Sequence, residues 1–213
     1  MNVTVFGATG AIGQIVVAEL LTSRHTVTAY ARNAAKVPAS WPADVRVVVG
    51  EITDAGAIDT AVAGADAVIS ALGPSMDKKA TGLPLVDGTK LIIEAMHRHG
   101  VKRFIGNGTP SVTDKRDKGT LQQKFVGFMG RTMLPRAYQE LLGMSDLIMN
   151  SGIDWTIVRF IAPKDGPAKG VMRHGFFGTD KIGFGVTRAD IAAFTAAQLT
   201  DNRYHNAAPA ISN

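Results

Sequence analysis

The chain has 213 residues, of which 46% are hydrophobic and 19% charged; this is typical of a globular protein with a substantial core and indicates one domain over residues 1–213. It has no cysteine, so disulfide bonds, thiolate nucleophiles and cysteine-ligated metal sites are excluded. The formal net charge is +5, but no nucleic-acid-binding motif accompanies it, so we expect no nucleic-acid partner.

A glycine-rich turn follows the first predicted strand. The strand is residues 3–6 (VTVF), the turn is residues 7–13 (GATGAIG), and residues 14–21 form an amphipathic helix. Glycine permits a sharp turn and the close approach of a pyrophosphate, and the free N–H groups at the start of the helix favour an anion. A strand, a glycine turn and a helix in this order predict a dinucleotide site.

The residue after the second predicted strand bears on the choice of cofactor. Residues 26–31 form this strand, and Arg32 follows it, 19 residues after Gly13. In dinucleotide-binding folds a carboxylate at this position binds the ribose 2′-hydroxyl, whereas a cation accommodates a 2′-phosphate. Arg32, assisted by Lys36, therefore favours NADP(H) over NAD; the alternative is an ordinary exposed loop arginine.

Strands and helices alternate along the rest of the chain. This alternation predicts an α/β fold: a doubly wound parallel sheet of the Rossmann type, with helices on both faces and the ligand crevice at the carboxyl ends of the strands. We expect the third strand, residues 45–49, to be buried on both faces except at Arg46, and we expect Asp54 and Thr187 to cap helices. The remaining predicted elements are helices over residues 55–63, 85–99, 137–150 and 188–199 and strands over residues 66–71, 101–106 and 154–160.

Candidate site residues follow three of these strands. Glu51 either borders the adenine or is a solvated turn residue, and the small residues around Gly73 allow the backbone to approach a cofactor. The hydroxyl groups of Thr109 and Ser111 either orient the nicotinamide or substrate, or stabilise their own loop. Two histidines near the end of a predicted helix are expected to complement its dipole, so we expect no metal site.

A basic segment follows the fifth strand. Between residues 111 and 136, six basic residues stand against two acidic ones, and the second half contains Phe125, Phe128 and Met129. We expect a lid over the active site, with a partner or dimer surface as the alternative. The substrate side is then formed mainly by residues 111–136 and 160–186.

Six stretches together carry a family resemblance that covers nearly the whole chain. They are GATGAIG at 7–13, ARN at 31–33, GEITD at 50–54, VKRFI at 101–105, SGIDWTIVR at 151–159 and TRADIA at 187–192. With these motifs the chain resembles an atypical short-chain dehydrogenase/reductase, in the NAD(P)H-binding group related to biliverdin reductase B (flavin reductase) and to NmrA-like proteins.

The resemblance implies an extended Rossmann fold that binds NADP(H). There are two departures: Glu51 stands where the family usually has aspartate, and segment 111–136 looks longer than in the flavin reductase. The residues implied for the cofactor are Gly7, Thr9, Gly10, Ala11, Ile12 and Gly13 at the phosphates, Arg32 at the 2′-phosphate, Glu51 and Ile52 at the adenine, and Ala71, Leu72 and Gly73 along the cofactor, with Thr109 and Ser111 near the nicotinamide as candidate catalytic residues.

The ordinary short-chain enzymes use a tyrosine with a lysine four residues later, because the lysine lowers the pKa of the phenol. Tyr30, Tyr138 and Tyr204 are followed at that spacing by alanine, leucine and alanine. Hydride transfer to an isoalloxazine, a quinone or a linear tetrapyrrole can draw its proton from solvent. We therefore expect an NADPH-dependent oxidoreductase that transfers hydride to a conjugated planar acceptor.

Two other functions are open. The missing tyrosine–lysine pair also fits a non-catalytic NADP(H) sensor of the NmrA-like type, and an isomerase or epimerase that uses bound NAD is less well supported. We expect a small planar molecule as partner and a monomer or weak homo-oligomer. No apolar run is long enough to cross a bilayer and no signal peptide is visible, so we expect a cytoplasmic protein without a membrane partner.

Overall fold

The structure is a computed structural model that describes residues 1–77, 79–171 and 173–213. The strands are β1 (Asn2–Phe6), β2 (Thr26–Ala31), β3 (Arg46–Val49), β4 (Ala67–Ser70), β5 (Arg103–Gly108), β6 (Asp154–Arg159), β7 (Pro163–Lys164), β8 (Arg173–Gly175), β9 (Val186–Thr187) and β10 (Ala210–Ser212). The helices are α1 (Gly13–Thr22), α2 (Ala55–Val62), α3 (Pro84–Arg98), α4 (Leu121–Met133), α5 (Pro135–Met149) and α6 (Arg188–Ala197), with short 3-10 helices at Ala34–Lys36 and Asn202–Tyr204.

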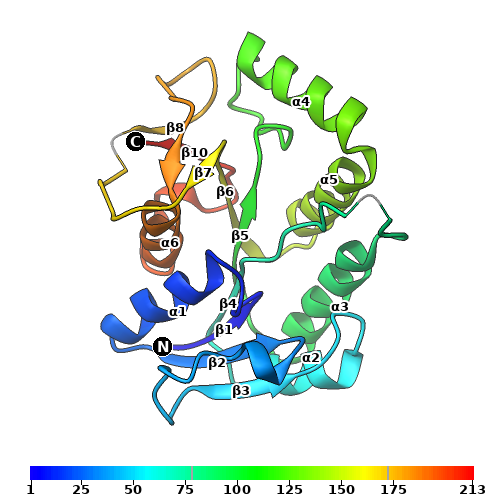
Figure 1. The fold of residues 1–213 in the computed structure, drawn as a ribbon, viewed down its shortest axis with the longest axis vertical. Coiled ribbons are helices and arrows are strands. Elements are labelled where there is room, and N and C mark those ends of the chain that lie inside the picture. The colour runs from blue at the N-terminus through cyan, green and yellow to red at the C-terminus, as the bar shows by residue number, and fades with distance from the viewer. Residues whose placement is uncertain (78, 172) are drawn as a thin grey trace.

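An eight-stranded sheet forms the centre of the molecule (Figure 1). Its strand order is β3-β2-β1-β4-β5-β6-β10-β8, and β7 pairs with β9 in a separate parallel ladder. Neighbouring strands of the large sheet are parallel from β3 to β10, and only the pair β10 and β8 is antiparallel. The predicted doubly wound α/β fold is confirmed. After β1, the chain passes through α1 and returns as β2, which lies parallel to β1 on the side away from β4, as expected for a βαβ crossover.

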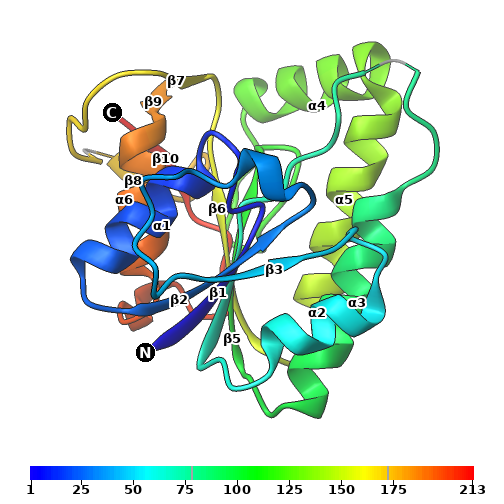
Figure 2. The same ribbon diagram turned by 60° about the horizontal axis from the view of Figure 1, so that its bottom comes forward.

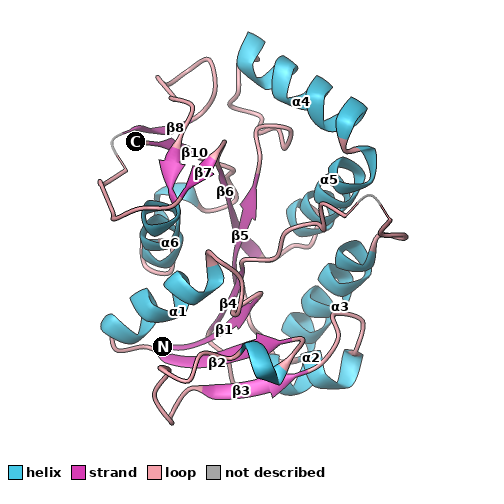
Figure 3. Ribbon diagram, viewed as in Figure 1, coloured by secondary structure: helices cyan, strands magenta, loops and turns pink. Residues whose placement is uncertain are grey.

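Helices cover both faces of the sheet (Figures 2 and 3). α1 packs beside α6 on one face, and α2, α3 and α5 lie on the other. Each face has its own hydrophobic core, because the central strands are rich in β-branched residues that are buried on both sides. Two predicted helix caps are confirmed: Asp54 accepts a hydrogen bond from the N–H of Ala57 (3.0 Å), and Thr187 accepts one from the N–H of Asp190 (3.1 Å).

The prediction that β3 is buried on both faces is wrong. β3 is an edge strand of the sheet, so only β2 pairs with it. Val48 packs against the core beneath α2 and α3, but Val47 and Val49 point to the opposite face and are 38% and 50% exposed. A valine-rich run cannot distinguish a central strand from an edge strand, because the pattern records apolarity and not position in the sheet.

The structure also contains a helix that we did not predict, α4, within the basic segment. Thr120 opens it with a capping box: its hydroxyl accepts the N–H of Gln123, and the side-chain oxygen of Gln123 accepts the N–H of Thr120, both at 3.2 Å. α4 lies at the rim of the molecule, beyond the carboxyl end of β5, and leads directly into α5 (Figure 1).

Candidate cofactor and active site

The glycine-rich turn lies between β1 and α1, where the backbone of three segments meets. Gly7 has a φ of +73°, and a Cβ at this position would lie 2.9 Å from the carbonyl carbon of Ala71. A Cβ on Gly13 would overlap the carbonyl oxygen of Gly7. Both positions therefore require glycine, and the turn is held tightly against the exit of β4.

The N-terminus of α1 faces this turn without a side-chain cap. In the described part of the chain, the backbone N–H groups of Ala11, Ile12 and Gly13 donate no hydrogen bond, and Gly10 and Ala11 are exposed to solvent. Free N–H groups at the positive end of a helix dipole favour an anion. The turn thus has the donors and the open approach that a pyrophosphate group needs.

Arg32 follows the last residue of β2 and is exposed. Within the described residues, its guanidinium forms neither a hydrogen bond nor an ion pair. Asn33 accepts the N–H of Ala35 at 2.9 Å and starts the 3-10 helix that ends at the exposed Lys36. Two cations without acidic partners therefore follow β2, the position at which this fold meets the adenosine ribose.

The backbone at the predicted adenine edge is fixed by two contacts. The hydroxyl of Tyr30 donates to the carbonyl oxygen of Glu51 at 2.7 Å, and burial, with the nearby Asp54 and Glu51, raises the pKa of Tyr30 to about 12. Ile52 lies against α3 so closely that a Cβ on Gly88 would overlap it. The side chain of Glu51 itself is exposed, which leaves both interpretations of this residue open.

Residues after β4 and β5 reach the same edge of the sheet as the glycine-rich turn, because β1, β4 and β5 are neighbours. The N–H of Ala71 donates to the carbonyl oxygen of Phe6 at 2.9 Å, and the chain then continues through Leu72 and the exposed Gly73. Past β5, the hydroxyl of Thr109 accepts a long 3.4 Å hydrogen bond from the N–H of Ser111. This bond lies within the loop, as the alternative role of Thr109, stabilisation of its own loop, requires.

Ser111 lines a cavity of about 340 Å³ beneath α4. The loop after β5 forms one wall, and Gln123, Lys124 and Gly127 of α4 form another. Tyr138 of α5 closes the cavity, and its ring packs so near Gly130 that a Cβ there would lie 2.9 Å from the ring. The described lining contains neither Phe125 nor Phe128, the two aromatic residues expected in a lid.

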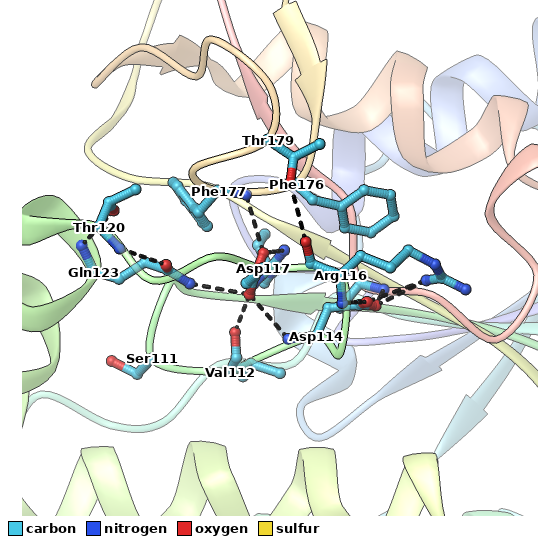
Figure 4. Close-up of polar contacts among 12 residues, drawn as sticks. Ser111, Val112, Asp114, Arg116, Asp117, Thr120, Gln123, Phe176, Phe177 and Thr179 are labelled. Atoms are coloured by element: carbon cyan, nitrogen blue, oxygen red, sulfur yellow. Dashed lines mark hydrogen bonds and ion pairs between the residues drawn. The ribbon is translucent and has the colours of Figure 1, made fainter.

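Asp117, half of a buried ion pair, fixes the loop between β5 and α4; Figure 4 shows it among Asp114, Gln123 and Phe177. Asp117 accepts hydrogen bonds from Arg159 of β6 at 2.6 and 3.0 Å, from the N–H groups of Asp114 (2.9 Å) and Phe177 (3.0 Å), and from Gln123 of α4 (3.0 Å). Arg159 is fully buried. Burial opposes the ionisation of Asp117, but the hydrogen bonds and charge of Arg159 outweigh it, so its pKa lies below the ordinary value. One carboxylate thus joins four segments: the loop after β5, α4, β6 and the loop that contains Phe177.

A second set of polar contacts joins the loop after β4 to α5. Arg136 donates to the backbone carbonyl oxygens of Ser75 and Gly82 and to the buried carboxylate of Glu140, the last at 3.0 Å. Glu140 in turn accepts the N–H of Leu85 at 2.9 Å, and so caps α3 from another helix. The loop on the cofactor side of β4 and the start of α5 are therefore fastened to each other.

Sequence reasoning did not find Asp117, Arg159, Lys124 or Tyr138 as part of this site. The capping box formed by Thr120 and the glutamine three residues later is a readable sign of a helix start, and it could have placed α4. Nothing local marks Arg159 as buried, because its partner lies 42 residues away in the sequence.

The described residues contain no helix long and apolar enough to cross a membrane. They also contain no group of three or more histidine, aspartate or glutamate side chains that could hold a metal ion. His97 lies in the last turn of α3 and His99 is its C-cap residue, as expected, and their rings also contact the carbonyl oxygen of Ser151 at 3.0 Å and the carboxylate of Asp59 at 3.1 Å.

The chain matches a known protein family over most of its length. Residues 7–202 match a family model described as NAD(P)H-binding. The uncharacterized protein Rv2047c of Mycobacterium tuberculosis is 31% identical over 105 residues, which make up 49% of this chain but only 12% of that protein. The chain therefore matches a small part of this curated relative.

Two solved structures have the same fold over nearly their whole length. The anaerobillin reductase ChuY of Escherichia coli is 19% identical with a TM-score of 0.80, and the match covers 99% of this chain and 96% of that chain. A short-chain dehydrogenase/reductase of Veillonella parvula, solved in complex with NADP, is 19% identical with a TM-score of 0.79 and coverage of 100% and 94%. At this identity the likeness shows the fold alone.

Proposed function

Since the chain belongs to the NAD(P)H-binding family, we propose that it is an NADPH-dependent reductase that transfers hydride to a conjugated planar acceptor such as a flavin or a quinone. The observation that carries this proposal is the cavity of about 340 Å³ beside Ser111, past the carboxyl end of β5 and so at the same edge of the sheet as the glycine-rich turn. The reductase ChuY, which shares the fold, agrees with this class of reaction.

The cofactor preference rests on the charges after β2. Arg32 is exposed and, within the described residues, has no acidic partner, so its guanidinium is available for a 2′-phosphate. The free N–H groups at the start of α1 would hold the pyrophosphate, and the close approach of Gly7 to Ala71 would keep the cofactor along the exits of β1 and β4. NADPH then supplies the hydride.

The residues of this chain contribute positioning more than proton transfer. Ser111 and Thr109 would orient the nicotinamide or the acceptor by hydrogen bonds. Tyr138 and Gly127 would form the walls against which the acceptor lies. Leu142 occupies the place of the lysine that would lower the pKa of Tyr138. A conjugated acceptor that takes its proton from water does not need that lysine.

The test is the oxidation of NADPH by the purified protein, followed by loss of NADPH absorbance with FMN, with a small quinone and with no acceptor. Oxidation that depends on the acceptor supports a reductase. The matched control is Gly13→Ala, which should remove the cofactor site and with it the oxidation.

A non-catalytic NADP(H) sensor is the second candidate, because the tyrosine–lysine pair is missing and α4 offers exposed apolar residues to a partner. A sensor would bind NADPH and NADP tightly and oxidise NADPH with none of the acceptors. Tight binding without turnover would therefore reject the reductase and favour the sensor. In either case we propose a monomer or a weak homo-oligomer.

A further inference from the structure

The outward face of α4 is apolar, which is the reverse of an ordinary surface helix. Gln123 faces the protein and bonds Asp117, and Gly130 packs against the ring of Tyr138. At 100° per residue, the opposite side of the helix carries Leu121, Phe125 and Phe128. They are 85%, 58% and 56% exposed. These three side chains therefore point away from the body of the protein.

Further exposed apolar side chains lie at both ends of α4. Met133, 62% exposed, lines a small cavity together with Met76, which is 63% exposed. At the other end, Gln122 donates to the carbonyl oxygen of Gly183 at 3.2 Å, which places the 56% exposed Phe184 next to the first turn of α4. Most of the large apolar side chains that the described surface exposes thus gather around one helix. Such a patch marks an interaction surface.

The charged side chains that α4 itself carries are all basic, and the exposed Asp77 lies at the far end of the face, in the cavity with Met76 and Met133. Lys124 and Arg131 lie along one edge of the apolar stripe on α4 and are exposed, and residues 118–139 contain no aspartate or glutamate. The two acidic residues just before this segment already form ion pairs: Asp114 pairs with Arg116 at 3.0 Å, and Asp117 pairs with a buried arginine. The cations beside the stripe are therefore not neutralised by neighbouring acids.

We propose that α4 and its flanking side chains dock on an anionic lipid surface. A helix with aromatic and aliphatic residues on one face and lysine and arginine beside them is suited to lie in the plane of a membrane interface. Its 13 residues give a contact about 20 Å long. A second copy of the chain fits less well, because two such faces would bring Lys124 and Arg131 of both copies together without an acid to pair them.

This contact is peripheral and does not require a spanning segment. The expectation of no membrane partner rested on the absence of such a segment and of a signal peptide, and neither bears on a helix that lies on the surface. The proposal does not rest on the reductase activity, because the apolar side chains that carry it, Leu121, Phe125 and Phe128, do not line the cavity beneath α4.

The test is cosedimentation of the whole protein with vesicles of phosphatidylcholine alone, or of about two parts phosphatidylcholine to one part phosphatidylserine. We expect binding to the anionic vesicles only, and loss of that binding near 1 M salt, where the Debye length falls to about 3 Å. Binding to neither vesicle, or equally to both, would overturn the proposal.

Three paired variants separate the contributions. Lys124→Glu/Arg131→Glu should lower the partition coefficient at least about 25-fold, at about fivefold for each cation lost. Phe125→Ser/Phe128→Ser should abolish binding, and the matched control Val47→Ser/Val49→Ser, which removes two exposed valines from the edge strand β3, should bind as wild type. Far-UV circular dichroism shows that each variant is folded.

Sedimentation velocity supplies the remaining outcome. A wild-type dimer that Phe125→Ser/Phe128→Ser converts to a monomer, together with no binding to vesicles, would assign the face to a second copy and reject the lipid surface. Phe125→Ser/Phe128→Ser should lose vesicle binding and leave NADPH affinity unaffected, because neither side chain lines the cavity, so failure of this proposal and failure of the reductase proposal are distinguishable.

Discussion

Removing the carboxylate of Asp117 should destabilise the protein strongly. In Asp117→Ala, Arg159 keeps its charge in a fully buried position, and the N–H groups of Asp114 and Phe177 and the amide of Gln123 lose their acceptor. Breaking a buried pair on one side costs about 3–5 kcal/mol. For a chain of this size each kcal/mol lowers Tm by about 2–4 °C, so we expect a fall of about 6–20 °C.

The assay is urea unfolding followed by circular dichroism for Asp117→Ala, Arg159→Met and the double variant. Because the two side chains are in contact, the double variant should lose less than the sum of the single losses. Losses that add within about 0.5 kcal/mol, or a cost of Asp117→Ala below about 1 kcal/mol, would refute the reasoning.

The pH dependence of the same pair gives an independent check. The pKa of Asp117 is lowered in the folded state, so its contribution to stability is present above the ordinary carboxyl pKa of about 3.9 and is lost as pH falls through the folded-state pKa. The gap in unfolding free energy between wild type and Asp117→Ala should therefore narrow below about pH 4. A gap that stays constant as pH falls well below about 4 would show that the carboxylate contributes only through packing.

Three further predictions concern the cofactor site. Arg32→Ala should raise the Kd for NADPH by about 10- to 100-fold and leave that for NADH nearly unchanged, as measured by calorimetry; equal losses would exclude a 2′-phosphate contact. Gly13→Ala should abolish binding of both cofactors because its Cβ meets the carbonyl oxygen of Gly7, whereas Gly56→Ala, whose Cβ finds its nearest neighbour at 3.5 Å, should bind as wild type. Ser111→Ala should lower kcat/KM about tenfold with the Kd for NADPH unchanged, and an unaltered kcat/KM would restrict Ser111 to its loop.

Local patterns were enough to predict the sheet and the cofactor edge. Gly7 is required by its positive φ, and Gly13 is required because a Cβ there would meet the carbonyl oxygen of Gly7. Both requirements arise within the turn, so the local sequence is enough to predict it. Alternating strands and helices then place the residues after β1, β4 and β5 at one edge, because parallel strands share their carboxyl ends.

The segment 111–136 and the elements around it were harder to predict because their packing breaks the usual patterns. α4 buries Gln123 and exposes Phe125 and Phe128, so its hydrophobic periodicity predicts the wrong face as the buried one. The burial of Arg159 depends on Asp117, 42 residues away, and no local window contains both. The exposure of β3 depends on its place at the end of the sheet, which is a property of topology and not of sequence pattern.

The capping of α3 by Glu140 has a consequence for hydrogen–deuterium exchange. A first-turn amide of a helix ordinarily has no intrahelical acceptor and exchanges freely, but the amide of Leu85 is held at 2.9 Å by a carboxylate that belongs to α5. Its exchange rate therefore reports the undocking of α5, and not the fraying of α3. Arg136 joins that carboxylate to the carbonyl oxygens of Ser75 and Gly82. The exchange rate of this single amide therefore also reports whether the loop after β4 is held against α5.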